Sequence, residues 1–199
     1  AKPGNYSGVV EFVKGSHVQK VTVKLKVYNF TLPAANSIKF TFTFWDVFYK
    51  KWFGISKLTH QQRMRINRWL LSYRLTPNNN YTKKPCYPSI GMLKELQPLG
   101  ANYLSLTYIG RDKPWTKEDI QKRLDDYRKT IGELKKAGLY QDTFLKGYDE
   151  IDAHMDMVEF ARQIMPEIRK AFPDLKCYQT SFPNSKTEDL FNVWCPLFS

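Results

Sequence analysis

The sequence predicts an α/β protein with an all-β part at its N-terminus, and three observations lead to this class. Over roughly the first fifty residues, apolar and polar side chains alternate with the period of two that marks half-buried strands. After about Gly54, predicted strands alternate with amphipathic helices. The chain of 199 residues is 42% hydrophobic and 15% aromatic, which is enough to bury a core. We therefore expect one domain over residues 1–54 and a second over residues 55–199.

Three strands are expected in the N-terminal part, at Tyr6–Val13, Lys20–Tyr28 and Ile38–Phe44. Turn-forming residues separate them at positions 14–16 and 32–36. Each strand has one apolar and one polar face, as in an antiparallel sheet of a β-sandwich. Three strands do not complete a sandwich, so we expect this part to be the end of a larger one.

The rest of the chain reads as alternating helices and strands. Thr116 can cap the longest helix and Gly138 can end it. We expect helices at Thr59–Leu71, Ser89–Leu99, Thr116–Ala137 and Met155–Phe172, with a short helical stretch at Thr187–Leu190. We expect strands at Trp69–Leu75, Asn102–Ile109, Thr143–Tyr148, Lys176–Phe182 and Asn192–Phe198.

Such alternation implies a parallel sheet with right-handed crossovers. A doubly wound sheet and a TIM barrel both fit. No strand is followed by G-x-G-x-x-G or a P-loop, so the nucleotide-binding form of the doubly wound sheet loses support. A barrel needs eight strands and about 250 residues, and only about five strands are visible after residue 60. A barrel in this chain is therefore expected to be incomplete.

Composition narrows the partners. The chain has 31 basic and 19 acidic residues, a net charge of +12, which attracts polyanions. Basic and acidic residues are mixed along the later helices, and no arginine-rich arm, zinc-finger spacing or RNA-binding aromatic signature occurs. We therefore expect a solvated basic surface and no nucleic-acid partner. No apolar run approaches the roughly 20 residues of a transmembrane helix.

Cysteine and asparagine usage bears on cofactors and compartment. The three cysteines, Cys86, Cys177 and Cys195, show no C-x-x-C spacing, and we expect neither a metal nor an organic cofactor. Three Asn-x-Ser/Thr sequons begin at Asn5, Asn29 and Asn80, which favours a secreted or extracellular glycoprotein. We expect Asn80 to be the most accessible of the three, because it lies in a predicted loop.

The Asp149–Glu150 pair is the main candidate site. It follows the predicted strand Thr143–Tyr148, where side chains of a parallel sheet face a ligand. Two close carboxylates push their pKa values apart, so one can stay protonated as a general acid while the other stays anionic. The alternative is a solvated loop start with an acid that caps the next helix.

The order of several phrases resembles glycoside hydrolase family 123 and its DUF4091-type relatives, over nearly the whole chain. No single phrase is specific, but their order and spacing are. The phrases are Pro3-Gly4-Asn5-Tyr6-Ser7-Gly8, Val27-Tyr28-Asn29-Phe30-Thr31-Leu32-Pro33, Arg74-Leu75-Thr76-Pro77, Gly100-Ala101-Asn102, Lys135-Lys136-Ala137-Gly138-Leu139, Gly147-Tyr148-Asp149-Glu150, Ala171-Phe172-Pro173-Asp174-Leu175-Lys176 and Val193-Trp194-Cys195-Pro196-Leu197. The resemblance implies the end of a β-sandwich followed by the first half or so of a (β/α)8 catalytic barrel.

The resemblance also implies an activity, the hydrolysis of β-linked N-acetylhexosaminides, in particular N-acetylgalactosaminides. The 2-acetamido oxygen of the substrate attacks the anomeric carbon in this retaining mechanism, so no enzyme nucleophile is needed. Glu150 would be the general acid and base. Asp149 would hold the acetamido N–H and stabilise the positive intermediate.

Four further residues are candidates for glycan binding. By resemblance, Arg74 lies at the end of the first barrel strand, where its guanidinium can bind sugar hydroxyls; the alternative is a structural ion pair. Tyr108 and Tyr148 can line the pocket or pack in the barrel. Trp194 can stack on a sugar face or pack in the core.

Two other functions remain open at this point. A non-catalytic glycan-binding or structural glycoprotein can keep the same fold, since an incomplete barrel lacks the later loops of a pocket. A basic polyanion-binding module is supported only by the net charge of +12.

Overall fold

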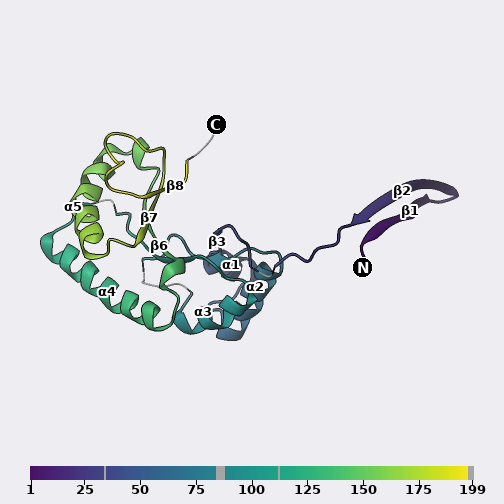
Figure 1. Ribbon diagram of the computed structural model, residues 1–199, viewed down its shortest axis with the longest axis horizontal. Coiled ribbons are helices and arrows are strands. Elements are labelled where there is room, and N and C mark those ends of the chain that lie inside the picture. Colours follow the sequence, from purple (N-terminus) through teal and green to yellow (C-terminus); the bar gives the residue numbers. More distant parts are fainter. Residues whose placement is uncertain (34, 84–87, 112, 197–199) are drawn as a thin grey trace. The chain divides into compact units, whose positions relative to one another are not determined.

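The computed structural model describes residues 1–33, 35–83, 88–111 and 113–196 (Figure 1). The chain divides into two compact units, Ala1–Pro33 and Ala34–Ser199. The division lies well before the expected boundary at residue 54, because residues 35–54 pack with the α/β part. Cys86 and the end of the expected strand Asn192–Phe198 lie outside the described residues.

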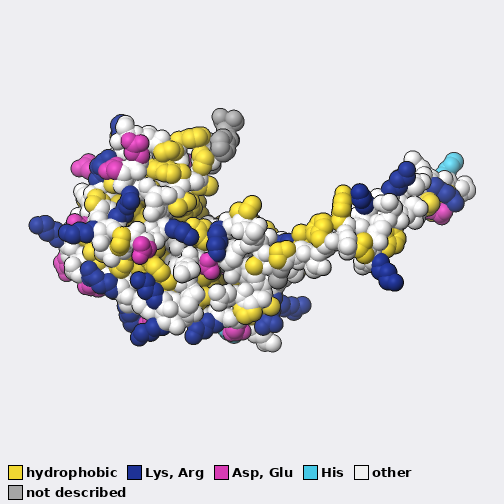
Figure 2. All heavy atoms as spheres, viewed as in Figure 1, with side chains coloured by type: hydrophobic (Ala, Val, Ile, Leu, Met, Phe, Trp, Pro, Cys, Tyr) yellow, Lys and Arg dark blue, Asp and Glu magenta, His cyan; other side chains and the backbone are white. Residues whose placement is uncertain are grey.

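The first unit is a β-hairpin. Strands β1 (Gly4–Lys14) and β2 (His17–Val27) pair antiparallel from Gly4↔Val27 to Lys14↔His17, as the alternation predicted. The two-residue turn begins at Gly15, whose φ of 59° favours glycine. One face is apolar and uncovered within residues 1–33, and exposed apolar side chains are visible along the hairpin in Figure 2. This face carries Tyr6, Val10, Phe12, Val21, Val23 and Leu25.

The third expected strand is the main difference in this region. Only Phe42–Thr43 forms a strand, β3, and it pairs in parallel with β4 (Pro77–Asn78) in the second unit. The helix α1 (Asp46–Phe53) follows directly, where no helix was expected. Its aromatic residues recur at helical spacing, with Phe48 packed on Trp52 and Tyr49 packed on Phe53.

Most of the remaining elements lie where the sequence predicts them. The helices are α2 (His60–Ser72), α3 (Ile90–Leu96), α4 (Lys117–Lys136) and α5 (Met155–Ala171). The strands are β5 (Leu104–Tyr108), β6 (Thr143–Asp149), β7 (Lys176–Thr180) and β8 (Val193–Trp194). Short 3₁₀ turns occur at Gln97–Leu99, Tyr140–Asp142 and Ile151–Ala153.

Capping explains the helix starts. Thr59 and Thr116 each accept a hydrogen bond from the N3 backbone N–H, and the N3 side chains bond back to the cap. The strand expected at Trp69–Leu75 does not form. Helix α2 continues to Ser72 instead, because Leu70 and Leu71 are buried on its inner face.

The second unit is mixed α/β, with a four-stranded parallel sheet in the order β5-β6-β7-β8. Neighbours in the sheet are also neighbours in the chain, and β3 and β4 form a further parallel pair. Hydrogen bonds link the β4 region to β5: Asn78 Nδ2 donates to the Tyr103 carbonyl, and the Tyr108 N–H donates to the Thr82 carbonyl.

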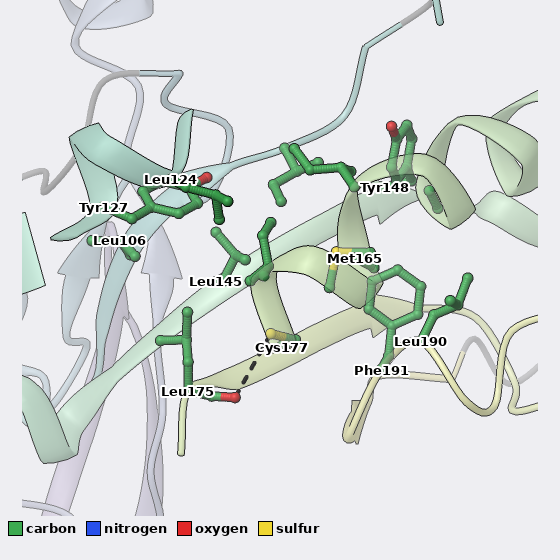
Figure 3. Close-up of a cluster of buried hydrophobic side chains, with 14 of the residues drawn as sticks. Leu106, Leu124, Tyr127, Leu145, Tyr148, Met165, Leu175, Cys177, Leu190 and Phe191 are labelled. Atoms are coloured by element: carbon green, nitrogen blue, oxygen red, sulfur yellow. Dashed lines mark hydrogen bonds between the residues drawn. The ribbon is translucent and has the colours of Figure 1, made fainter. Parts of the chain in front are cut away.

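The main core lies between this sheet and helices α4 and α5 (Figure 3). Both helices contribute to one apolar cluster, so both cover the same face of the sheet. The cluster holds Leu106, Leu145 and Cys177 from the strands, each fully buried. Burial raises the pKa of the Cys177 thiol to about 12, so the thiol stays protonated and packs as a small apolar group. A smaller cluster of Met64, Leu71, Met92, Leu96 and Ala101 joins α2 to α3.

Candidate functional site

Side chains from several strands meet where the strands end. Trp45 follows β3, Tyr81 follows β4, and Tyr108 ends β5. Asp149 ends β6, and Thr180 ends β7. Because β5, β6 and β7 are parallel in one sheet, Tyr108, Asp149 and Thr180 lie at its carboxyl edge, the edge at which α/β proteins bind ligands. Tyr81 joins them through its hydrogen bond to Asp149, and Trp45 packs on the Tyr81 ring.

Two β-bulges turn the site side chains to one face of the sheet. Between β6 and β7, Lys146 pairs with Tyr178 but Asp149 pairs with Thr180, so three residues of β6 advance against two. Side chains three apart in a regular strand face opposite ways, but this extra residue brings Lys146 and Asp149 to the same face. A matching register shift between Ser105 and Tyr108 of β5 does the same for Tyr108.

Gln179 supports the bulge in β6. Its side-chain oxygen accepts the Tyr148 N–H at 2.9 Å, and its side-chain nitrogen donates to the Tyr148 carbonyl. The fully buried amide therefore satisfies the peptide groups that the bulge takes out of the sheet ladder.

Glycine is required at two positions beside the bulges. A Cβ on Gly147 would lie 2.3 Å from the Phe191 ring and 2.7 Å from the Gln179 amide oxygen. A Cβ on Gly110 would lie 2.1 Å from the Tyr108 hydroxyl. Close packing against these backbone atoms thus holds both bulges in place.

Asp149 is tied by three side chains. Its Oδ1 accepts from Lys146 Nζ at 2.8 Å and from the Thr180 hydroxyl at 2.9 Å. The Tyr81 hydroxyl lies 3.2 Å from Oδ2 and 3.3 Å from Oδ1. Burial alone would raise the pKa of Asp149, but Lys146 and the two hydroxyl groups outweigh it and lower the pKa. Asp149 is therefore held as an anion.

Glu150 differs from Asp149 in its exposure, its side-chain partners and its backbone conformation. It is exposed, and no hydrogen bond or ion pair joins its carboxylate to any residue in the described part of the chain. Its backbone N–H donates to the Thr180 hydroxyl at 3.2 Å. Its backbone is left-handed, with φ 46° and ψ 48°, a strained conformation for a residue other than glycine and one that clusters at functional sites.

Of the predicted tyrosines, the structure brings only Tyr108 to the site. Its ring packs edge-on against Tyr81 at 5.4 Å and lies 5.5 Å from Lys146 Nζ. Tyr148 lies on the other face of the sheet and is fully buried in the core, where its hydroxyl accepts from Trp115 Nε1 at 2.9 Å. The bulge is the reason: it leaves Tyr148 facing the helices while Asp149 faces the site.

Arg74 and Trp194 also lie elsewhere. Arg74 follows helix α2 and precedes β4, so it lies near the amino end of that strand, opposite the end that carries Tyr81. Its backbone is left-handed (φ 62°) and its carbonyl accepts from Asn36. Trp194 packs against the main core and contacts the Phe191 ring at 6.0 Å between centroids. Neither side chain joins the carboxylate pair.

Four residues of the site were not predicted: Trp45, Tyr81, Lys146 and Thr180. A lysine inside an otherwise apolar strand was the available signal for Lys146, because lysine is almost never fully buried unless it is paired. Tyr81 gave no signal, since it lies 68 residues before its partner Asp149.

Asn79 organises the loop that carries Tyr81. Its side-chain oxygen accepts from the Tyr81 N–H at 3.1 Å and from Trp45 Nε1 at 2.8 Å. The Trp45 indole is 39% exposed and packs on the Tyr81 ring, so it is an accessible aromatic surface beside the site. The neighbouring Asn80 is only 8% exposed, so the sequon expected to be most accessible is buried.

An apolar groove lies beside the N-terminal elements of the second unit. It has a volume of about 1120 Å³ and is lined by aromatic side chains of β3, α1 and α2, including Trp52 and Trp69. Asp149 and Glu150 are not among its lining residues. Within the described ranges, no group of three or more His, Cys, Asp or Glu side chains is placed to hold a metal ion. Among those same residues, no helix is long and apolar enough to cross a membrane.

The chain matches no known protein-family model, and no curated protein matches it. In Figure 2 basic and acidic side chains are interspersed over the surface of the second unit, as in a solvated surface.

Proposed function

We propose that this chain is a glycoside hydrolase that cleaves β-linked N-acetylhexosaminides, in particular N-acetylgalactosaminides, by the substrate-assisted retaining mechanism. One observation carries the proposal: two adjacent carboxylates at the carboxyl edge of a parallel sheet have opposite environments. Asp149 is tied to Lys146, Thr180 and Tyr81, whereas Glu150 is exposed and unpaired among the described residues. The motif resemblance supplies the substrate class.

The division of roles follows from these environments. A fixed carboxylate, held anionic, can accept the acetamido N–H and stabilise the positive charge of an oxazolinium-like intermediate, the role of Asp149. A carboxyl group free of ion pairs can give a proton to the leaving oxygen and then take one from water, the role of Glu150. Trp45, Tyr81 and Tyr108 supply aromatic surfaces of the kind that stack on sugar rings.

The topology supports a barrel as the fold of the second unit. Strands β3 to β8 occur in chain order, each parallel to its neighbour where a ladder is formed, and α4 and α5 cover one face. A doubly wound sheet instead reverses its strand order and places helices on both faces. We propose that β3 begins the barrel and that the hairpin β1–β2 belongs to a β-sandwich, since its apolar face needs a second sheet.

Hydrolysis of an aryl β-N-acetylgalactosaminide tests the function. We expect turnover by the chain, a loss of about 10²- to 10⁴-fold in kcat/KM for Glu150→Gln, and no change for Glu118→Gln, an exposed glutamate of α4. Full activity of Glu150→Gln would overturn the assignment of the acid.

A second candidate is a non-catalytic glycan-binding protein with the same fold. The aromatic groove of α1 and α2 favours it, because exposed indoles such as Trp52 (74% exposed) can stack on sugars. Glycan binding that is retained in Glu150→Gln and lost in Trp52→Ala, without turnover by the unmodified chain, would support this candidate instead.

A secreted glycoprotein is also proposed. The sequon asparagines Asn5 and Asn29 are exposed, and intact-mass analysis of the secreted chain tests whether they carry glycans.

A further inference from the structure

Lys146 is a buried cation in the middle of strand β6. The residue is 1% exposed, yet its ammonium group lies at the functional edge of the sheet rather than in the helix-covered core. Burying a charge costs free energy unless a partner compensates for it. The compensation here comes from one carboxylate and a set of aromatic rings.

Three tyrosine rings surround the ammonium group. Lys146 Nζ lies 3.6 Å from the centroid of the Tyr81 ring, 5.5 Å from Tyr108 and 5.9 Å from Tyr178. The rings come from three different strands or their loops, and their faces attract a cation. With these rings beside it, the Lys146 side chain is only 1% exposed, whereas that of its partner Asp149 is 40% exposed.

The other charged and titratable groups near Lys146 come from the ends of β6 and β8. They are Asp149, Glu150 and Cys195. Only Asp149 is bonded to the ammonium, at 2.8 Å, and burial lowers the pKa of Lys146 while Asp149 opposes this shift. The bond from Lys146 and the bond from the Thr180 hydroxyl both hold Oδ1 of Asp149. The other oxygen, Oδ2, accepts from the Tyr81 hydroxyl. The Asp149 side chain as a whole is 40% exposed.

We propose that Lys146 is a positioning residue, which locks the Asp149 carboxylate in place as the anion of the pair and leaves proton transfer to Glu150. This inference deepens the proposed function and rests on it for its catalytic consequence. Lys146 touches no substrate; it acts through Asp149. The bulge in β6 is what makes the arrangement possible, because it places residues 146 and 149 on one face.

The first test needs no substitution at Lys146 and no measurement of activity. The side-chain carboxyl carbons of Asp149 and Glu150 are titrated by ¹³C NMR in the intact chain, with Asp149→Asn and Glu150→Gln used to assign the signals. We expect the Asp149 signal to titrate below the usual value of about 3.9 for aspartate. Titration of Asp149 at or above this usual value would overturn the proposal.

The second test uses Lys146→Met, which keeps the chain length and the ring contacts but removes the charge. We expect the midpoint of Asp149 to rise by about one pH unit or more, a tenfold change in proton affinity. Thr180→Val is the matched control: it removes a neutral hydrogen bond to the same oxygen, and we expect a smaller rise. An unchanged Asp149 midpoint in folded Lys146→Met would contradict the role of Lys146.

The third test measures the catalytic consequence with the aryl β-N-acetylgalactosaminide. We expect Lys146→Met to lower kcat by about 10- to 100-fold with a smaller change in KM, because a misplaced group costs chemistry more than binding. The acidic limb of the pH profile should also move to higher pH, which a merely structural change would not cause. No turnover by the unmodified chain would defeat the proposed function alone, since the titrations still report on Lys146. Turnover with an unmoved pH profile in Lys146→Met would defeat the positioning role alone.

Discussion

The two faces of the parallel sheet are buried in different ways. The face under α4 and α5 is closed by aliphatic side chains such as Leu106 and Leu145, both fully buried. The opposite face is closed near β6 by aromatic rings and polar groups: Phe144 lies between Tyr103 and Tyr178, and Lys146 lies among three tyrosines. Adjacent residues of one strand therefore lie in an aliphatic core on one side and among aromatic rings and polar groups on the other.

The difference shows why a parallel strand buried on both faces can still carry a site. Aliphatic packing tolerates no charge, whereas tyrosine rings accept a cation and supply hydroxyls, so a buried lysine can be held beside a partly exposed carboxylate. Substitutions on the two faces should consequently separate in their effects.

The largest expected effect lies on the helix-covered face. Leu106→Ala should lower the free energy of unfolding by about 2–5 kcal/mol, because it removes a buried side chain and leaves a cavity. Urea denaturation followed by circular dichroism measures the change. A loss under about 1 kcal/mol would show that this face can collapse around the cavity.

An intermediate effect is expected at Gln179, whose buried side-chain amide bonds the Tyr148 peptide groups in the β6 bulge. Gln179→Leu should cost about 1–3 kcal/mol, because it leaves the buried Tyr148 N–H without its acceptor and removes the donor closest to the Tyr148 carbonyl. The same denaturation experiment measures this cost, and Gln121→Leu, at an exposed position of α4, is the control. If both variants unfold alike, the amide of Gln179 does not support the bulge.

A smaller effect is expected at Thr180 on the site face. Thr180→Val should destabilise the chain by about 1 kcal/mol, because it removes the hydroxyl that donates to the partly exposed Asp149 carboxylate and accepts from the Glu150 N–H. Compared with Leu106→Ala, we expect Thr180→Val to lower the rate of hydrolysis more and the free energy of unfolding less. If the two variants rank equally or in the opposite order in these measurements, the two faces do not differ in this way.

The smallest effect concerns pH. Because the pKa of Asp149 is lowered in the folded chain, its contribution to stability is present above the unfolded value of about 3.9 and is lost as the pH falls through the lower folded value. The stability difference between the unmodified chain and Asp149→Asn should therefore shrink below about pH 4. Solvent screening of the 40% exposed side chain keeps this effect small. A difference that grows in acid would give the opposite sign.

Sequence patterns predicted the regular elements of the second unit closely where local chemistry defines them. Helix α4 begins after its predicted cap Thr116, and β6 begins at the predicted Thr143. The patterns failed where contacts between neighbouring strands determine the local structure. The bulges depend on the register between strands, which turned Tyr148 to the core although it precedes the pair directly.

The carboxylate pair was predicted, but its surroundings were not. Lys146 and Thr180 come together with Asp149 only in the folded sheet, and Thr180 lies 31 residues away in the chain. Arg74 was expected at a strand end from the family resemblance, and Trp69–Leu75 was expected to be a strand. Burial of Leu70 and Leu71 extends the helix instead and leaves Arg74 near the other edge.

The left-handed backbone of Glu150 makes any residue other than glycine costly in stability at this position. Glycine accepts this conformation without strain, so Glu150→Gly should make the chain more stable while removing the acid. If Glu150 is the proposed acid, selection for stability and selection for activity therefore favour different residues at this position. Among sequences that share this sheet, glycine or asparagine here would then mark chains that keep the fold without the proposed hydrolysis.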